Sequence, residues 1–217
     1  MRLVERDYTI LRELERWRFA LSRQIRLLCG FPSQRTCDRR LKLLIENGYI
    51  DRKHILYGVP SLYTTTHKGR QLIGISGKSD KIKVEQITHD IAVVDTVIYF
   101  HFDYGVKLDK IITEKELHKQ DGFGTRKHQP DFVRIFDVGD TKHCIEVELT
   151  AKSKERMLKI MQDNFENYYI QFWVVPRSQS KIRTILEENA NTYPNIEVIA
   201  LETIADFVKK AGANNGE

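Results

Sequence analysis

The sequence predicts a mixed α/β (α+β) protein made of two domains: a small helical domain with a β-hairpin, followed by a domain with a mixed sheet. The order of helical and strand-like periodicities differs between the two halves of the chain. The 217 residues are enough for two small cores. Charge is also divided unevenly, because residues 1–83 carry 18 Lys/Arg and 8 Asp/Glu, a net +10, whereas the remainder carries 17 and 22, a net −5.

Composition excludes several classes of protein. No apolar run approaches the roughly 18–20 residues that a helix needs to cross a bilayer. Charged residues interrupt the apolar stretches near the N-terminus, so no signal-peptide core is expected and we expect a cytoplasmic protein. Cys29, Cys37 and Cys144 lack the spacing of a structural zinc site and are expected to be reduced core residues.

Three helices are predicted in the first fifty residues. Asp7 is the expected N-cap of the first, Ser22 of the second and Ser33 of the third. A turn at residues 30–32 separates the second helix from the third, which ends at Gly48. The third helix has a stripe of apolar residues for burial: Cys37, Leu41, Leu44 and Ile45.

Two strands, at residues 50–56 and 61–65, and a short helix capped by Thr66 are predicted next. A hairpin directly after a helix-turn-helix is the order of a winged helix, so we expect residues 1–83 to bind double-stranded DNA. The third helix is the expected recognition helix, and the hairpin is expected to contact the sugar-phosphate backbone. The DNA-binding residues predicted in this way are Gln34, Arg35, Arg39, Lys42, Arg52 and Lys53, with His54 beside the last two.

The same helices could instead dock another protein, in which case the arginines would only be solvated. The charge asymmetry favours DNA, and so does the lack of apolar anchors on the polar face of the third helix.

The second half begins with a linking helix at residues 84–102. After this helix the pattern predicts three strands, a helix, a strand, a helix and a final strand, which fits a mixed sheet covered by helices. The expected domain boundaries are therefore 1–83 for the winged helix, 84–102 for the linking helix, 103–208 for the second domain and 209–217 for a disordered tail.

Acidic residues in the second domain indicate a metal site. A two-residue turn at Gly139-Asp140 would place Asp131 opposite Glu148 and Val133 opposite Glu146. Three carboxylates on one face, Asp131, Glu146 and Glu148, would repel one another unless they bound a cation, and such hard oxygen ligands suit Mg²⁺ or Mn²⁺. The alternative is that the alternating glutamates simply form the solvent face of a strand.

A bound metal ion in this position would activate water for phosphodiester cleavage, with Asp131, Glu146, Glu148 and Lys152 as the catalytic residues. Lys152 is expected to orient the water or to stabilise the phosphorane. A further acid is sought in Glu85, Asp90 or Glu114. Arg126 and Lys127, in a loop at residues 118–129, are expected to hold a phosphate, whereas His89 and His128 are left outside the site.

The Pro130-Asp131 pair, with Glu146-Val147-Glu148 beginning fifteen positions after Asp131, resembles the PD-(D/E)XK nuclease signature. This chain departs from the signature at Glu148, where lysine is usual, and Lys152 is the expected spatial substitute. The arrangement of a winged helix, THDIAVVD, HQPDF and EVELTAKSKER also resembles the replication-relaxation family of plasmids and other mobile elements. This resemblance implies a role in plasmid replication or DNA relaxation, with replication or relaxation proteins as partners.

Two functions stay open at this point. The chain is either a DNA-binding nuclease or nickase of a mobile element, or a non-catalytic replication accessory factor or transcriptional regulator whose nuclease-like domain only dimerises or docks a partner. A homodimer would suit a pseudo-palindromic target, but the sequence specifies no interface.

Overall fold

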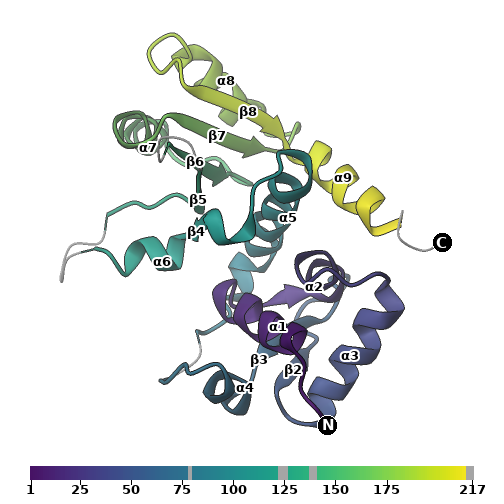
Figure 1. Ribbon diagram of the computed structural model, residues 1–217. Helices are drawn as coiled ribbons and strands as arrows, with labels where there is room; N and C mark the ends of the chain where they lie inside the picture. The colour runs from purple at the N-terminus through teal and green to yellow at the C-terminus, as the bar shows by residue number, and fades with distance from the viewer. Residues whose placement is uncertain (78–79, 122–126, 137–140, 214–217) are drawn as a thin grey trace. The chain divides into compact units, whose positions relative to one another are not determined.

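The computed structural model describes residues 1–77, 80–121, 127–136 and 141–213, and confirms a mixed α/β protein (Figure 1). The chain divides into two compact units. Unit 1 consists of Met1–Ile98 with Phe207–Glu217, and unit 2 of Tyr99–Asp206. The boundary therefore falls inside the predicted linking helix, which is observed as a 3₁₀ turn, η1 (Val84–Gln86), followed by α5 (Ile87–Asp103).

Unit 1 contains the three helices and the hairpin that the sequence predicts, in the predicted order. Its elements before η1 are α1 (Glu5–Arg16), β1 (Ala20–Leu21), α2 (Ser22–Leu28), α3 (Gln34–Glu46), β2 (Ile50–Lys53), β3 (Leu62–Thr65) and α4 (His67–Leu72). The three strands form one antiparallel sheet in the order β1-β3-β2. The strand β1 was not predicted, because two residues are too few to show a periodicity.

The helix caps agree with the sequence in two places and differ in two. Ser33 and Thr66 accept hydrogen bonds from the backbone N–H groups of Thr36 and Gly69, as N-caps should. Ser22, in contrast, is the first residue of α2. Asp7 is not the N-cap of α1 either. It lies inside the first turn, and its carboxylate accepts a hydrogen bond of 2.8 Å from the backbone N–H of Val4.

The orientation of α3 is fixed by its apolar stripe and by one buried ion pair. Cys37, Leu41 and Leu44 are buried, as predicted, whereas Ile45, the fourth member of the predicted stripe, is only half-buried. Gly48 adopts the left-handed conformation (φ +72°) that ends the helix. On the same helix, the Arg40 side chain donates hydrogen bonds to both carboxylate oxygens of Asp7, one of them at 2.6 Å. Asp7 is fully buried, so this pair joins α3 to the first turn of α1.

A second ionic contact joins α2 to α5 within unit 1. The Arg23 guanidinium donates two hydrogen bonds, of 2.6 and 2.7 Å, to the Asp95 carboxylate. The Gln24 amide donates to Asp95 at 2.8 Å and to the Ile91 carbonyl at 3.0 Å. These contacts give Asp95, the last residue of the THDIAVVD segment, a structural role in unit 1.

The strands and helices predicted after the linking helix are present in the predicted order, and three further elements, η2, α6 and α9, were not predicted. After α5 the described elements are η2 (Leu108–Lys110), β4 (Ile111–Thr113), α6 (Glu114–His118), β5 (Phe132–Ile135), β6 (Lys142–Val147), α7 (Lys154–Asn167), β7 (Ile170–Val175), α8 (Ser180–Asn189), β8 (Ile196–Ala200) and α9 (Leu201–Ala213). The strands form a sheet in the order β4-β5-β6-β7-β8, antiparallel as far as β6 and parallel from β6 to β8. The last helix, α9, overlaps the predicted disordered tail at residues 209–213.

The predicted register of the hairpin β5-β6 is wrong by two residues. Val133 pairs with Cys144, not with Glu146, and Phe132 pairs with Ile145. The Phe136 N–H donates to the Thr141 carbonyl at 3.0 Å, so the connection includes residues 137–140 and not only Gly139-Asp140; residues 137–140 lie outside the described part of the chain. A shift of two residues keeps each side chain on its predicted face of the sheet.

A buried arginine holds β5 against the aromatic core of unit 2. The Arg134 guanidinium carbon lies 4.7–5.1 Å from the ring centroids of Phe100, Tyr104, Phe136 and Phe172. Burial lowers the pKa of Arg134 to about 10, and burial together with the charge of Arg134 lowers the pKa of His143 to about 4. His143 is therefore neutral at pH 7, and its Nδ1 accepts a hydrogen bond of 2.8 Å from Arg134.

All three cysteines are free and buried, as predicted. Among the described residues, no helix is both long and apolar enough to cross a membrane.

The buried Asp7–Arg40 pair generates a stability prediction. Replacement of Asp7 by alanine leaves the Arg40 charge without its partner, and we expect the free energy of unfolding to fall by about 3 kcal/mol, as is typical when one partner of a buried pair is removed. Urea denaturation of the full chain measures this change. The control is Glu5→Ala, which removes a pair with Arg12 whose side chains are both largely exposed, and should cost less than about 1 kcal/mol. Equal effects of the two substitutions would contradict a structural role for Asp7.

Candidate functional site

The solvent face of α3 carries three cations at helical spacing. Arg35, Arg39 and Lys42 are separated by four and three residues, so they follow one face of the helix, and all three are exposed. Arg35 and Arg39 make no hydrogen bond or ion pair with any residue that the structure describes. Lys42, 75% exposed, lies 3.8 Å from Glu46 one turn further along the helix. This face can therefore offer three cations to an anionic partner.

The side chain of Gln34 is already engaged at the start of α3. Its amide nitrogen donates to Ser22 Oγ at 2.5 Å and to Asp38 Oδ1 at 2.9 Å, while Ser22 also donates to Asp38. This small network joins α3 to the first residue of α2. Because the amide nitrogen of Gln34 already donates to Ser22 and Asp38, a contact of Gln34 with a DNA base would have to use its amide oxygen.

The hairpin β2-β3 places its two predicted DNA contacts on opposite faces. Arg52 pairs with Tyr63 and Lys53 pairs with Leu62, and adjacent residues of a strand point to opposite sides. Arg52 therefore shares a face of the hairpin with Tyr63. Burial raises the pKa of the Tyr63 phenol, and the charges of Arg52 and of Asp38 on α3 also act on it. Because Tyr63 is near both residues, Arg52 lies on the α3 side of the hairpin. The predicted contacts of Arg52 and Lys53 with the sugar-phosphate backbone would therefore be made from opposite faces of the hairpin.

Tyr57 lies at the turn of this hairpin, and its side chain is fully exposed. Sequence reasoning did not select it. The sequence signal for an exposed Tyr57 was its place directly before Gly58, a residue typical of turns; in the structure Gly58 has φ +76°.

In unit 2, three acidic residues share one row across neighbouring strands. The registers of β4-β5 and β5-β6, continued by one residue, place Glu114 opposite Asp131 and Asp131 opposite Glu146. The Glu114 N–H donates to the Asp131 carbonyl at 3.0 Å, which supports this alignment. Of the three residues considered as a further acid, Glu114 is therefore the one beside Asp131. Glu85 and Asp90 belong to unit 1, where Asp90 lies 3.4 Å from Arg18.

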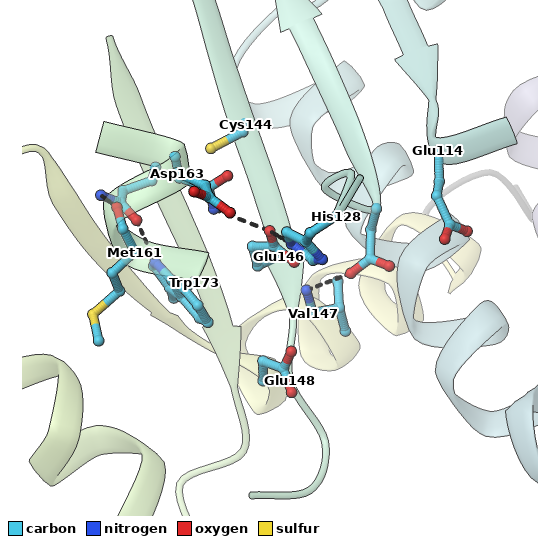
Figure 2. A network of polar contacts seen from close by, with 12 residues as sticks. Glu114, His128, Cys144, Glu146, Val147, Glu148, Met161, Asp163 and Trp173 are labelled. Atoms are coloured by element: carbon cyan, nitrogen blue, oxygen red, sulfur yellow. Dashed lines mark hydrogen bonds and ion pairs between the residues drawn. The ribbon is translucent and has the colours of Figure 1, made fainter. Parts of the chain in front are cut away.

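Glu146 lies in the centre of a polar network. Its side chain is almost fully buried, and its Oε1 accepts hydrogen bonds from His128 Nε2 at 2.8 Å and from the Asn164 amide on α7 at 3.0 Å (Figure 2). Glu146 is thus not part of a solvent face, and the alternative that the alternating glutamates only face solvent is wrong for this residue. His128, which sequence reasoning left outside the site, is one of its direct partners.

The other two predicted metal ligands also have partners within the protein. Asp131 Oδ2 accepts a hydrogen bond of 2.7 Å from the Val147 N–H (Figure 2). Glu148, only 4% exposed, is in contact with the ammonium group of Lys152. Burial lowers the pKa of Lys152, while the negative charges of Glu146 and Asp131 act to raise it. Lys152 therefore lies close enough to Glu146 and Asp131 for both charges to act on its ammonium group.

The fit of this site to a divalent cation is incomplete. Carboxylate oxygens suit Mg²⁺ or Mn²⁺. The carboxylates of Glu148, Asp131 and Glu146, however, already contact Lys152, the Val147 N–H, and His128 with Asn164, respectively. Within the described ranges, no group of three or more His, Cys, Asp or Glu residues is placed to hold a metal ion. Of the loop residues predicted to hold phosphate, Lys127 is exposed and Arg126 lies outside the described part of the chain.

Comparison of the chain with protein-family models, with curated proteins and with solved structures found no match.

The contact between His128 and Glu146 generates a pH prediction. Burial acts to lower the pKa of the His128 imidazole, but the hydrogen bond and the charge of Glu146 outweigh it, so the pKa lies above the ordinary 6.5. The stabilisation from this pair is fully present below pH 6.5 and is lost as the pH rises through the raised value. The stability difference between the wild type and His128→Gln should therefore shrink as the pH increases from 6 to 9.

An NMR titration of the imidazole measures the same contact directly. In Glu146→Gln the negative charge is gone while burial remains, so the pKa of His128 should fall below 6.5. The pKa of His143, which depends on Arg134, should stay near 4 as an internal control. An unchanged pKa of His128 in this variant would contradict the contact.

Proposed function

We propose that the chain binds double-stranded DNA through unit 1, with α3 in the major groove. The observation that carries this proposal is the cationic face of Arg35, Arg39 and Lys42, which lies opposite the buried stripe of α3. Arginine and lysine are the side chains that contact guanine edges and phosphates, and a helix of this kind fits the width of the major groove. Neutralising phosphates releases counterions, so binding should weaken steeply as salt increases.

The topology of unit 1 supports the same proposal. Three helices, with a short strand before the second and a hairpin after the third, follow the order of a winged helix, and the sheet order β1-β3-β2 is compatible with it. In this arrangement Arg52, on the α3 side of the hairpin, contacts the sugar-phosphate backbone. Lys53 points to the other side and is removed from the proposed DNA surface.

A protein-docking role for α3 is the competing proposal. Leu43 is 40% exposed on this helix, but it is accompanied by the cations and not by other large apolar side chains of α3. Interfaces between proteins normally have an apolar centre with few charges. The α3 surface fits DNA better.

Alanine substitution in α3 tests the DNA proposal. The double variant Arg35→Ala/Arg39→Ala should weaken binding to a duplex by at least about tenfold, since each arginine contact is typically worth about 1–3 kcal/mol. Fluorescence anisotropy of a labelled duplex at several salt concentrations gives both the affinity and the salt slope, which should become shallower. Lys154→Ala, which removes an exposed cation from unit 2, is the matched control and should bind as the wild type does. Wild-type affinity in the double variant would exclude α3 as the DNA-binding element.

A metal-dependent nuclease or nickase activity of unit 2 is a second candidate function. It is favoured by the order α5-β4-β5-β6-α7-β7, by the mixed sheet, and by the row of Glu114, Asp131 and Glu146 beside Lys152. This order agrees with the PD-(D/E)XK resemblance. The resemblance to the replication-relaxation family implies that such an activity would serve plasmid replication or DNA relaxation, in the cytoplasm and beside replication proteins. Because the carboxylates have protein partners, a cation would have to displace some of these partners. A non-catalytic accessory or regulatory role is what remains if this activity is absent.

Plasmid cleavage decides between these two roles. Supercoiled plasmid is incubated with the full chain and Mg²⁺, Mn²⁺ or EDTA, and nicked and linear forms are scored on gels. A nuclease should convert plasmid only with metal, and Asp131→Asn and Glu114→Gln should each reduce the rate by at least about 100-fold if both acids hold the ion. Intact plasmid under every condition, together with retained DNA binding, would establish the non-catalytic role.

A further inference from the structure

Unit 1 contains a cavity of about 420 Å³ on the side of the hairpin that Lys53 faces. This volume lies within the range of about 300–1,000 Å³ that is usual for small-molecule sites. Three cationic side chains line the cavity: Arg18, Lys53 and Lys81. They come from three separate segments, the connection between α1 and β1, the strand β2 and the residues before η1, so the fold and not one charged run brings them together.

Two acidic residues, Glu15 and Asp80, also line the cavity. Glu15 is compensated from within the protein, because its carboxylate lies 3.1 Å from Arg70 Nε and accepts a hydrogen bond of 2.9 Å from Thr65. Arg70 does not line the cavity, so it offsets the charge of Glu15 without adding a cation to the lining. The three lining cations therefore outweigh the acidic charge that remains.

Thr64 supplies a polar group that lacks a partner. Its side chain is 6% exposed and lines the cavity, and its Oγ1 is buried without a hydrogen-bond partner among the residues that the structure describes. A buried hydroxyl in this condition costs about 1–3 kcal/mol relative to a satisfied one. An oxygen-rich anion in the cavity would satisfy it.

The backbone at Arg18 is also unusual. Arg18 has φ +67°, and it is the one residue other than glycine with a positive φ in the described part of the chain. Asp90 lies 3.4 Å from its guanidinium, beside the cavity. A conformation of this kind is costly for a side chain with a Cβ, and such costs are often found at binding sites.

We propose that this cavity binds a phosphate group, held by Arg18, Lys53 and Lys81 with a hydrogen bond from Thr64. Lysine and arginine are the usual partners of phosphate, and a hydroxyl completes its shell of donors. Ile55 and Ile82 form an apolar wall beside the cations, which suits a phosphate carried on an organic group. The phosphate can come from a small phosphate ester or from a DNA backbone that reaches this side of the hairpin.

This site is separate from the DNA surface of α3. Lys53 and Arg52 are neighbours in sequence, but they point to opposite faces of the hairpin. The pair therefore offers two substitutions that remove the same charge from the same strand and should act on different ligands.

Isothermal titration calorimetry of the full chain with sodium phosphate and with adenosine monophosphate, at constant ionic strength, tests the proposal. Both probes should bind saturably to the wild type. Lys53→Gln and Lys81→Gln should each weaken binding at least tenfold, Thr64→Val should weaken it about fivefold, and Arg52→Gln should leave it unchanged. No saturable binding of either probe, or equal binding by Lys53→Gln, would overturn the proposal.

A second arm identifies the source of the phosphate. Duplex affinity is measured for the wild type and for Lys53→Gln with and without adenosine monophosphate. Wild-type duplex affinity in Lys53→Gln, with phosphate binding lost, assigns the site to a small phosphate ester. A loss of duplex affinity in Lys53→Gln, together with competition between duplex and nucleotide in the wild type, assigns it to the DNA backbone. Because Arg35 and Arg39 do not line the cavity, failure of α3 to bind DNA would leave the phosphate result unaffected.

Discussion

The buried pair between Asp7 and Arg40 is the interaction on which the proposed DNA surface depends. Asp7 is fully buried, accepts a hydrogen bond from the Val4 N–H at the start of α1 and binds the Arg40 guanidinium of α3, so it fixes the rotation of α3 about its own axis. Once Arg40 and the stripe of Cys37 and Leu41 face inward, the helical period leaves Arg35 and Arg39 on the solvent side. The exposed cationic face of α3 thus depends on an acidic residue, Asp7, that lies thirty-three positions before Arg40 in the sequence.

In unit 2 the corresponding constraint is the register of three adjacent strands. The antiparallel pairs β4-β5 and β5-β6 align Glu114, Asp131 and Glu146 in one row, although these residues are far apart in sequence. Acidic residues brought so close repel one another, and the protein offsets this cost with His128, Asn164, Lys152 and a backbone N–H. The same donors also occupy the oxygens that a metal ion would use. A cation would therefore compete with these partners.

The sequence predicts the elements of both units well, because their signals are local. The cap at Ser33, the stripe from Cys37 to Leu44 and the left-handed Gly48 are each set by neighbouring residues, and all are confirmed. The hairpin register is wrong because it depends on the length of a connection, and Gly-Asp is a turn signal that fits loops of several lengths. Even so, the two-residue error preserves the face of each acid, so the prediction that Asp131 and Glu146 lie together survives it.

The features that the sequence could not reveal depend on contacts between distant segments. No periodicity in the sequence indicates three of these features: the burial of Arg134 among aromatic rings, the contact of His128 with Glu146, and the cavity lined by Arg18 and Lys81. The separation of Arg52 from Lys53 is different, since strand alternation alone implies it. That conclusion was available from the two-residue period of the predicted strand.

The most direct test of the central claim is a map of the residues that change when DNA binds. Backbone amide chemical shifts of the full chain, recorded with and without a duplex, should change along the exposed face of α3 and at Arg52. Shift changes confined to unit 2, or their absence from α3 at saturating DNA, would contradict the account.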